Sequence, residues 1–180
     1  MLLQNLSLKQ LWELFPIVLV PHNPEWETWF SEECEALQKV IPHDALVAIH
    51  HIGSTSVPEI WAKPIVDILV ELKTSANMNA IAKSIEETGW IRMSETKTRI
   101  SLNKGYTLQG YAERVFHLHL RYEGDNTEVA FAEYLRNHSD VAKEYEKLKL
   151  SLWHKYEHDR DGYTEAKTDF IQKYSLLKEK

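Results

Sequence analysis

Hydrophobic residues in this 180-residue chain recur at two different spacings. Near the N-terminus and through the C-terminal third they return every three or four residues, which is the spacing of one face of an α-helix. In the middle of the chain, short apolar runs and stretches that alternate with polar residues are typical of β-strands. The order of these patterns predicts an α/β (α+β) fold, a β-sheet flanked by helices with a helical C-terminal part.

Capping and turn residues set the expected boundaries of these elements. Ser7 is placed to cap a first helix, Asn23 to begin a second, and Gly89 to end a third. Helices are predicted at residues 6–15, 24–40, 75–88, 127–137, 140–156 and 164–177. Strands are predicted at residues 17–20, 45–52, 65–72, 90–93, 99–102 and 114–122. The run Asn103-Lys104-Gly105 predicts a hairpin turn that returns through residues 106–108.

The composition limits the classes of protein to consider. A hydrophobic content of 43% and a charged content of 27% are ordinary for a soluble globular chain, and the length predicts a single domain over residues 1–180. A formal net charge of −6 argues against a surface for polymeric nucleic acid, because such surfaces are basic. A small nucleotide remains compatible with this charge.

Cysteine usage and the lack of long apolar runs bear on location. Cys34 is the only cysteine, which excludes an internal disulfide and fits a reducing compartment. No apolar run reaches membrane-spanning length, and the N-terminus lacks the pattern of a secretory signal. We therefore expect a cytoplasmic protein with no membrane partner, while the sequence predicts no oligomeric state.

A turn of small residues follows the apolar run at residues 45–52. It reads Gly53-Ser54-Thr55-Ser56, and its small side chains let the backbone approach a ligand closely. Successive N–H groups and three hydroxyls can surround an anion, and a short helical turn begun at Ser56 or Pro58 would add its positive end. The turn therefore predicts a site for a phosphate group.

Two carboxylates lie on the next apolar run, at residues 65–72. Positions 67, 69 and 71 share one face of a strand, so Asp67 and Glu71 point the same way. Burying them is costly unless they bind a cation or have a partner, which makes this face a candidate functional site. About 13 Å of extended strand separates the two residues, too far for them to share one ion.

The segment from Arg114 to Tyr122, RVFHLHLRY, alternates in polarity. His117 and His119 therefore lie on one face of a strand and the apolar residues on the other. Two histidines at this spacing can supply metal ligands or an acid–base group, while a hydrogen-bonded pair is the commoner outcome. His51, just before the glycine turn, is a weaker candidate for a ligand contact.

Two basic residues are candidates for phosphate contacts. Arg99 belongs to the most basic part of the chain, and a solvated position and a phosphate contact are equally open for it. Lys167 lies at helical spacing from Tyr163 and Phe170, and it is either a phosphate contact or an exposed lysine on a docked helix.

Several of these motifs together resemble a known family. The string Gly53-Ser54-Thr55-Ser56-Val57-Pro58, followed by Ala62-Lys63-Pro64-Ile65-Val66-Asp67-Ile68, resembles the signature of the GrpB family. Further matches, over roughly positions 17–174, are Pro24-Glu25-Trp26, His117-Leu118-His119, Tyr134-Leu135-Arg136 and the segment from Tyr163 to Phe170. The resemblance implies the mixed-sheet fold of the DNA-polymerase-beta-like nucleotidyltransferases, which bind a nucleoside triphosphate at a Gly-Ser turn and hold metal ions on acidic strand residues.

The resemblance also implies roles for individual residues. Asp67 would bind a divalent ion, magnesium first, and act in catalysis with Lys63. His117 and His119 would lie beside the Asp67 strand, and one of them, with His119 preferred, would take the place of a further metal ligand. The groups that would contact a nucleotide or another phosphorylated small molecule are Gly53, Ser54, Thr55, Ser56, Arg99, His117, His119 and Lys167.

This chain departs from the family and superfamily patterns at two positions. Glu59 stands where the family usually has glycine, which adds negative charge near the expected phosphate site. Leu69 stands two residues after Asp67, where active nucleotidyltransferases carry a second acid. The second departure puts metal-dependent transfer in doubt.

Three functions therefore follow from the sequence as hypotheses. The first is a nucleotidyltransferase-like enzyme that binds a nucleoside triphosphate and transfers a nucleotidyl group to an unknown acceptor. The second is a non-catalytic module that binds a nucleotide or phosphorylated metabolite, favoured by the loss of the acid at position 69. The third, ranked last, is a metal-dependent hydrolase that uses Asp67, His117 and His119.

Overall fold

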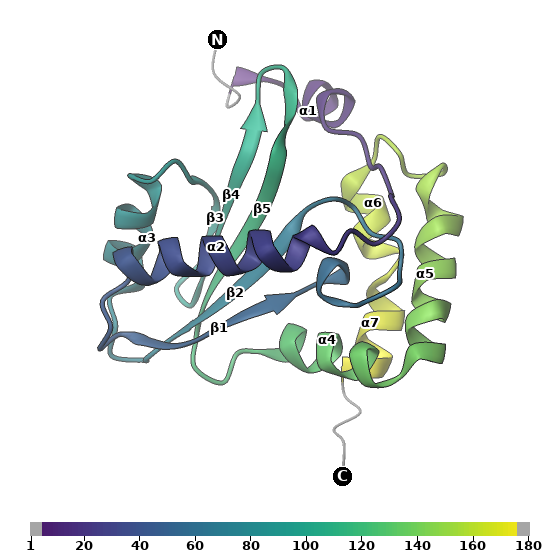
Figure 1. The fold of residues 1–180 in the computed structure, drawn as a ribbon. Coiled ribbons are helices and arrows are strands. Elements are labelled where there is room, and N and C mark those ends of the chain that lie inside the picture. Colours follow the sequence, from purple (N-terminus) through teal and green to yellow (C-terminus); the bar gives the residue numbers. More distant parts are fainter. Residues whose placement is uncertain (1–4, 176–180) are drawn as a thin grey trace.

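The computed structural model describes residues 5–175, which form a five-stranded sheet with helices against it (Figure 1). The strands are β1 (Leu46–Ile52), β2 (Val66–Leu72), β3 (Ile91–Glu95), β4 (Arg99–Thr107) and β5 (Gly110–Tyr122). The helices are α1 (Leu8–Leu14), α2 (Glu25–Val40), α3 (Met78–Glu86), α4 (Thr127–Asn137), α5 (Ser139–Trp153), α6 (Arg160–Glu165) and α7 (Thr168–Ser175), with a 3-10 turn, η2, at Ser54–Ser56.

The sheet is mixed, with strand order β1-β2-β5-β4-β3. The central pair β2 and β5 is parallel, and the other neighbours are antiparallel. The predicted α/β (α+β) class, a mixed sheet flanked by helices with a helical C-terminal part, is confirmed. The parallel pairing sets Asp67 of β2 opposite His117 of β5, so the two strands carry their polar residues side by side.

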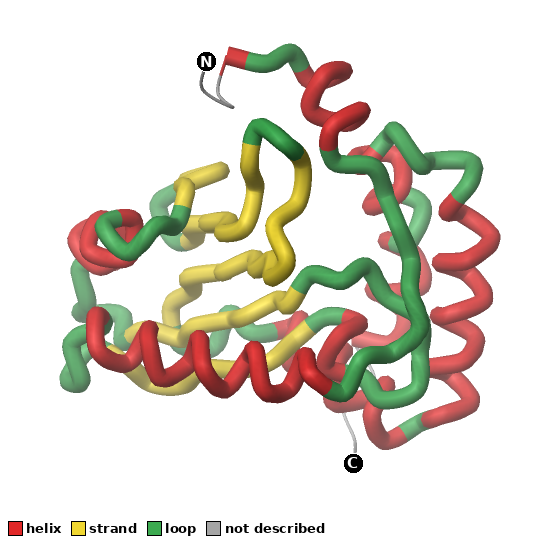
Figure 2. Tube along the Cα trace, turned by 45° about the horizontal axis from the view of Figure 1, so that its top comes forward, coloured by secondary structure: helices red, strands yellow, loops and turns green. Residues whose placement is uncertain are grey.

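The two faces of the sheet differ because side chains alternate along each strand. Helices α2 and α3 cover one face, where Trp26 and Ile81 belong to a core with Ile68, Val70 and Leu118 (Figure 2). The intervening residues of β2 and β5 point to the opposite face, namely Asp67, Leu69, Glu71, His117, His119 and Arg121. The aromatic residues of α2, Trp26, Trp29 and Phe30, therefore pack in or against the core of the sheet.

The helices of the C-terminal part stand together at one end of the sheet, beside the turn after β1 (Figure 1). Helices α4, α5 and α7 share a core that includes Phe131, Tyr145 and Tyr174. Val57, directly after the glycine turn, belongs to the same core. Tyr163 of α6 packs with Ile17 and the extended segment after α1. Glu146 and Lys149 of α5 also bond the backbone of Trp61, in the segment that leads into β2.

Capping confirms several predicted boundaries. Ser7 caps α1 in a capping box with Gln10. Helix α2 begins one residue later than predicted, with Pro24 at its N-cap, and the Asn23 side chain accepts a hydrogen bond from the Glu25 amide. Gly89 follows α3 with a φ of 95°. No helix in the described part of the chain is long and apolar enough to cross a membrane.

Three predicted elements are corrected. Gly105 does not make a hairpin turn, because β4 continues to Thr107 and the turn follows it. Gly105 lies instead in a β-bulge against β5, where the register shifts between Lys104 and Tyr106. A Cβ at Gly105 would lie 2.3 Å from the Arg114 carbonyl oxygen, so the bulge requires glycine.

The strand predicted at residues 17–20 forms only one bridge, between Val20 and Ala62. The helix predicted at 164–177 is divided into α6 and α7, and its last two residues lie outside the described part.

Glu59 occupies a position that suits glycine. Its φ is 63°, and it is the one non-glycine residue at positive φ among residues 5–175. A left-handed conformation costs a residue with a Cβ about 1–2 kcal/mol. The glycine usual at this position in the resembled pattern therefore has a conformational reason.

We expect Glu59→Gly to stabilise the protein by about 1 kcal/mol, because relief of strain exceeds the entropy that glycine adds to the unfolded chain. Its melting temperature would rise by about 2–4 °C in a calorimetric scan. The control is Glu87→Gly, since Glu87 is exposed at a φ of −64° and should only lose stability. An unchanged or lowered melting temperature for Glu59→Gly would show that Glu59 carries no strain.

Candidate functional site

A cavity of about 190 Å³ lies where the glycine turn, the start of β2 and the C-terminal helices meet. Its residues come from segments up to 114 positions apart in the sequence, from Gly53 to Lys167. They are Gly53, Ser54 and Thr55 from the turn, Lys63, Ile65 and Asp67 at β2, His117 of β5, Tyr145 and Lys149 of α5, Tyr163 of α6, and Lys167. The structure thus brings the predicted turn, Lys63, Asp67, His117 and Lys167 into one site.

Gly53 holds the turn directly against the Asp67 carboxylate. Its φ is 70°, and a Cβ on Gly53 would lie 2.5 Å from Asp67 Oδ2. Both the backbone conformation and the close approach therefore require glycine. The Ser56 hydroxyl donates to the Gly53 carbonyl and so braces this turn from within.

Asp67 belongs to a chain of hydrogen bonds that runs across the sheet. Its Oδ1 lies 3.1 Å from His117 Nδ1, His117 Nε2 lies 2.7 Å from the Tyr106 hydroxyl, and Arg160 Nη2 donates to that hydroxyl at 3.1 Å. An ionised Asp67 accepts the Nδ1 proton of a neutral His117, so Tyr106 donates to Nε2. His119 Nε2 lies 3.6 Å from Asp67 Oδ1, beyond hydrogen-bond distance.

The network fixes the charge of Asp67. Burial alone would raise its pKa, but the hydrogen bond from His117 and the nearby His119 outweigh burial and hold the pKa well below its usual range. Burial lowers the pKa of His117 in spite of Asp67, so the imidazole is neutral. The predicted alternative of hydrogen-bonded histidines therefore matches this geometry at His117 but not at His119.

Three lysines surround the single carboxylate. Lys149 is buried and donates to the Trp61 carbonyl, and its Nζ lies 5.0 Å from the centre of the Tyr145 ring. The Nζ atoms of Lys63 and Lys167 lie 5.7 and 4.2 Å from the centre of the Tyr163 ring. Among the residues described, none of these three ammonium groups forms an ion pair with a carboxylate.

The lysines hold their protons weakly. Burial, reinforced by Lys167 and other nearby cations, lowers the pKa of Lys63 to about 7. Burial and Lys167 likewise lower the pKa of Lys149 to about 7, and burial lowers the pKa of Lys167 to about 8. The cavity therefore holds more potential positive charge than its one carboxylate balances.

Tyr163 contributes its ring to the cavity wall, beside the ammonium groups of Lys63 and Lys167. The residue is 1% exposed, and its hydroxyl is buried with no hydrogen-bond partner among the described residues. Buried polar groups in folded proteins nearly always have a partner, so this hydroxyl is an exception in residues 5–175.

The donor set does not fit the predicted magnesium ion. Magnesium prefers six oxygen ligands, yet Asp67 is the one acidic group among the described residues that line the cavity. The place of a second acid is taken by Leu69, which is fully buried, and Glu71 is bonded instead to His50, Gly124 and Asn126. No group of three or more His, Cys, Asp or Glu side chains in residues 5–175 is arranged to hold a metal.

The hydrolase hypothesis meets the same difficulty. It needs both imidazoles on one ion with Asp67, but both ring nitrogens of His117 already have protein partners. The predicted metal roles of Asp67 and His119 are therefore not carried into our proposal.

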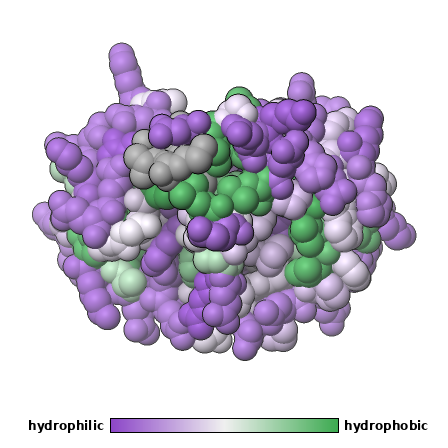
Figure 3. All heavy atoms as spheres, turned by 90° about the horizontal axis from the view of Figure 1, so that it is seen from above, coloured by the Kyte–Doolittle hydropathy of each residue, from purple (hydrophilic) through white to green (hydrophobic). Residues whose placement is uncertain are grey.

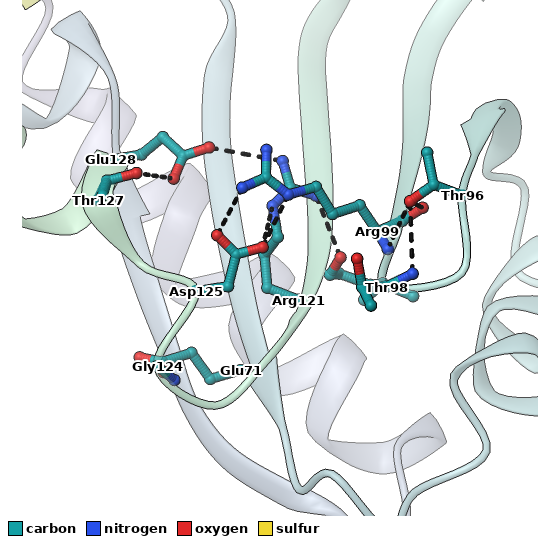
Figure 4. Close-up of polar contacts among 10 residues, drawn as sticks. Glu71, Thr96, Thr98, Arg99, Arg121, Gly124, Asp125, Thr127 and Glu128 are labelled. Atoms are coloured by element: carbon teal, nitrogen blue, oxygen red, sulfur yellow. Dashed lines mark hydrogen bonds and ion pairs between the residues drawn. The ribbon is translucent and has the colours of Figure 1, made fainter. Parts of the chain in front are cut away.

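Arg99 does not reach the cavity, contrary to the interpretation that made it a phosphate contact. It makes a bidentate pair with Asp125, at 2.7 and 2.6 Å, close to Arg121 (Figure 4), and it is not among the residues that line the cavity. In the register of β4 and β5, Arg99 lies opposite Arg121, four residues beyond His117. Ser56 also lies outside the cavity lining, because its hydroxyl is used within the turn.

Sequence reasoning missed Lys149, Tyr145, Tyr106 and Arg160. The sequence does contain a signal for Lys149, which follows Tyr145 by four residues and so lies on the apolar stripe of α5. Burying a lysine there is costly, so its presence indicates a binding or catalytic role. Tyr106 was assigned to the return strand of a hairpin that does not form. His51 stacks on Phe30 and bonds Thr55, so it supports the turn from the α2 side.

The chain is similar in sequence to a family of known proteins. A model of the GrpB protein family matches residues 16–176. The UPF0157 protein YqkA of Bacillus subtilis is 30% identical over 170 residues, which cover 93% of this chain and 48% of that protein. The glutamate-rich protein GrpB of Alkalihalophilus pseudofirmus is 30% identical over 162 residues, covering 86% of this chain and 91% of that protein. This chain thus spans about half the length of YqkA.

Solved structures give a matching picture of the fold. A crystal structure of the conserved protein GrpB from Enterococcus faecalis aligns with a TM-score of 0.70 and 27% identity, over 87% of this chain and 99% of that one. A structure of the Cid1 poly(U) polymerase bound to MgATP aligns at a TM-score of 0.47 and 13% identity, over 72% of this chain and 45% of that one. A likeness at this level carries no inference about activity.

We expect Gly53→Ala to destabilise the protein by about 2 kcal/mol or more, because it adds a clash with Asp67 to the strain of a positive φ. The matched control is Gly89→Ala, whose φ is 95° but whose Cβ would meet nothing within 4 Å. Denaturant unfolding of both variants separates strain from clash. Equal losses of unfolding free energy in the two variants would mean that a side chain at position 53 does not clash with Asp67.

Proposed function

This chain belongs to the GrpB family, and from the cavity that its Gly-Ser turn closes we propose that it binds the phosphoryl end of a nucleotide or another phosphorylated small molecule, without a metal ion. The observation that carries the proposal is the set of three lysines around one carboxylate. A phosphoryl group supplies the missing negative charge and accepts hydrogen bonds from ammonium groups and hydroxyls.

The size of the cavity limits which part of the ligand enters it. A volume of about 190 Å³ is roughly that of six waters, and it is smaller than the 300–1,000 Å³ typical of a whole ligand site. One or two phosphoryl groups fit this space. The remainder of the molecule would lie outside it.

Each lining group has a part in the proposal. Lys63, Lys149 and Lys167 carry the charge in place of a metal ion. Asp67 attracts Lys63 and Lys167 and positions the turn through Gly53. His117 holds Asp67 ionised.

Nucleotidyl transfer is the second candidate, and the pKa of Lys63 favours it. A lysine with a pKa of about 7 can accept the proton of an acceptor hydroxyl or amine near neutral pH. The acceptor oxygen or nitrogen would then bond to the α-phosphorus as pyrophosphate leaves. Release of pyrophosphate from ATP with an added acceptor, lost in Lys63→Met, separates transfer from binding alone.

The binding proposal is tested by calorimetric titration of ATP and pyrophosphate in the presence of a chelator. We expect binding without magnesium, and Lys149→Met should weaken it at least tenfold by removing a buried cation. The matched control is Lys147→Met, an exposed lysine two residues away on the same helix.

Two results would contradict the proposal. One is that neither compound binds, or shifts the melting temperature, at millimolar concentration. The other is binding that requires magnesium and is unaffected by Lys149→Met.

A further inference from the structure

A second and larger cavity lies beneath α1. Its volume is about 550 Å³, within the range of sites for whole small molecules. Helix α1, strands β3 and β4 and helix α6 contribute its walls. His117 lines both this cavity and the one that contains Lys63, Lys149 and Lys167 (the lysine cavity), and its hydrogen-bond partner Tyr106 lines the larger one. The two cavities therefore meet at His117.

The walls of this cavity are mainly apolar. Helix α1 buries none of its residues, so Leu11 and Trp12 direct their apolar surface at the cavity instead of a packed core. Leu8 and Met93, two of the most exposed large hydrophobic residues among those described, lie at its edge at 60% and 57% exposure. Viewed from the end of the molecule where α1 lies, hydrophobic residues form a patch within a mostly hydrophilic surface (Figure 3).

One cation in this cavity has no direct carboxylate partner among the described residues. Arg160 donates one hydrogen bond, to the Tyr106 hydroxyl, and forms no ion pair with any carboxylate in residues 5–175. A guanidinium has five N–H donors, so most of its capacity is unused. By contrast, Arg92 in the same wall is paired with Glu86 and Glu95.

We propose that this cavity binds a small carboxylic acid with an apolar body, whose carboxylate pairs with Arg160. A planar guanidinium matches a carboxylate with two parallel hydrogen bonds. A monoanion suits the site better than a dianionic phosphate ester, because Asp161 also lines the cavity and offsets part of the positive charge. The apolar body covers the surfaces of Leu11, Trp12 and Met93 that no other part of residues 5–175 buries.

The test uses 1-naphthoate, the neutral 1-naphthamide and the dianionic 1-naphthyl phosphate as probes in calorimetric titrations of the full chain. We expect naphthoate to bind at least tenfold more tightly than either analogue. Arg160→Met should remove this preference, and Arg160→Lys should restore part of it. Met93→Glu, which adds a negative charge at an exposed position, should weaken naphthoate at least tenfold while leaving pyrophosphate binding unchanged.

The control is Val47→Glu, which adds the same charge at a residue 45% exposed on β1, away from the cavity. It should leave naphthoate affinity unaltered. Equal affinity for naphthamide and naphthoate, no naphthoate binding at millimolar concentration, or equal losses in Met93→Glu and Val47→Glu would each overturn the proposal. Because pyrophosphate is measured in parallel, failure here is distinct from failure of the lysine cavity.

Discussion

The site depends on the electrostatic imbalance between three lysines, one buried and two half-buried, and the one carboxylate that lines the cavity with them. Partial removal from water disfavours the charged form of a lysine, and each neighbouring ammonium disfavours it further. Asp67 offsets part of this cost for Lys63 and Glu146 offsets part for Lys149, yet both pKa values fall to about 7. A fold that needed only stability would fill these positions with apolar side chains, so the arrangement points to an anionic ligand that completes it.

The sheet supplies the fixed part of this arrangement. Parallel pairing of β2 and β5 sets His117 beside Asp67, and the positive φ of Gly53 lets the turn lie against the same carboxylate. The lysines come from a loop and from the C-terminal helices, which dock through Tyr145 and Tyr163. Asp67 thus acts as an anchor for the turn and the lysines, a role that needs no second acid at position 69.

The sequence predicted those features of the site that depend on residues close together in the chain, and it missed those that depend on contacts between distant segments. Local patterns predicted most elements and the glycine turn, because alternation and glycine chemistry act over a few residues, and helical spacing offered Lys167 as a candidate. The resemblance added Lys63 and the placement of the His117 strand beside Asp67. Arg99 was misjudged because the strand register, which sets it opposite Arg121 and beside Asp125, depends on pairing between distant segments.

Other misses have the same origin. Gly105 permits either a turn or a bulge, and the approach of the Arg114 carbonyl decides between them. Lys149 enters the site only through the docking of α5 against the turn, which no local pattern encodes.

Proton uptake on ligand binding is the most direct measurement of the imbalance. ATP would be titrated calorimetrically at pH 8.0, about two units above the second pKa of a phosphate monoester, in chelator and in buffers that differ in ionisation enthalpy. A bound phosphoryl group raises the pKa of Lys63 and Lys149, so the account predicts uptake of about one to two protons per ATP. Binding without proton uptake, or no binding unless magnesium is present, would contradict it.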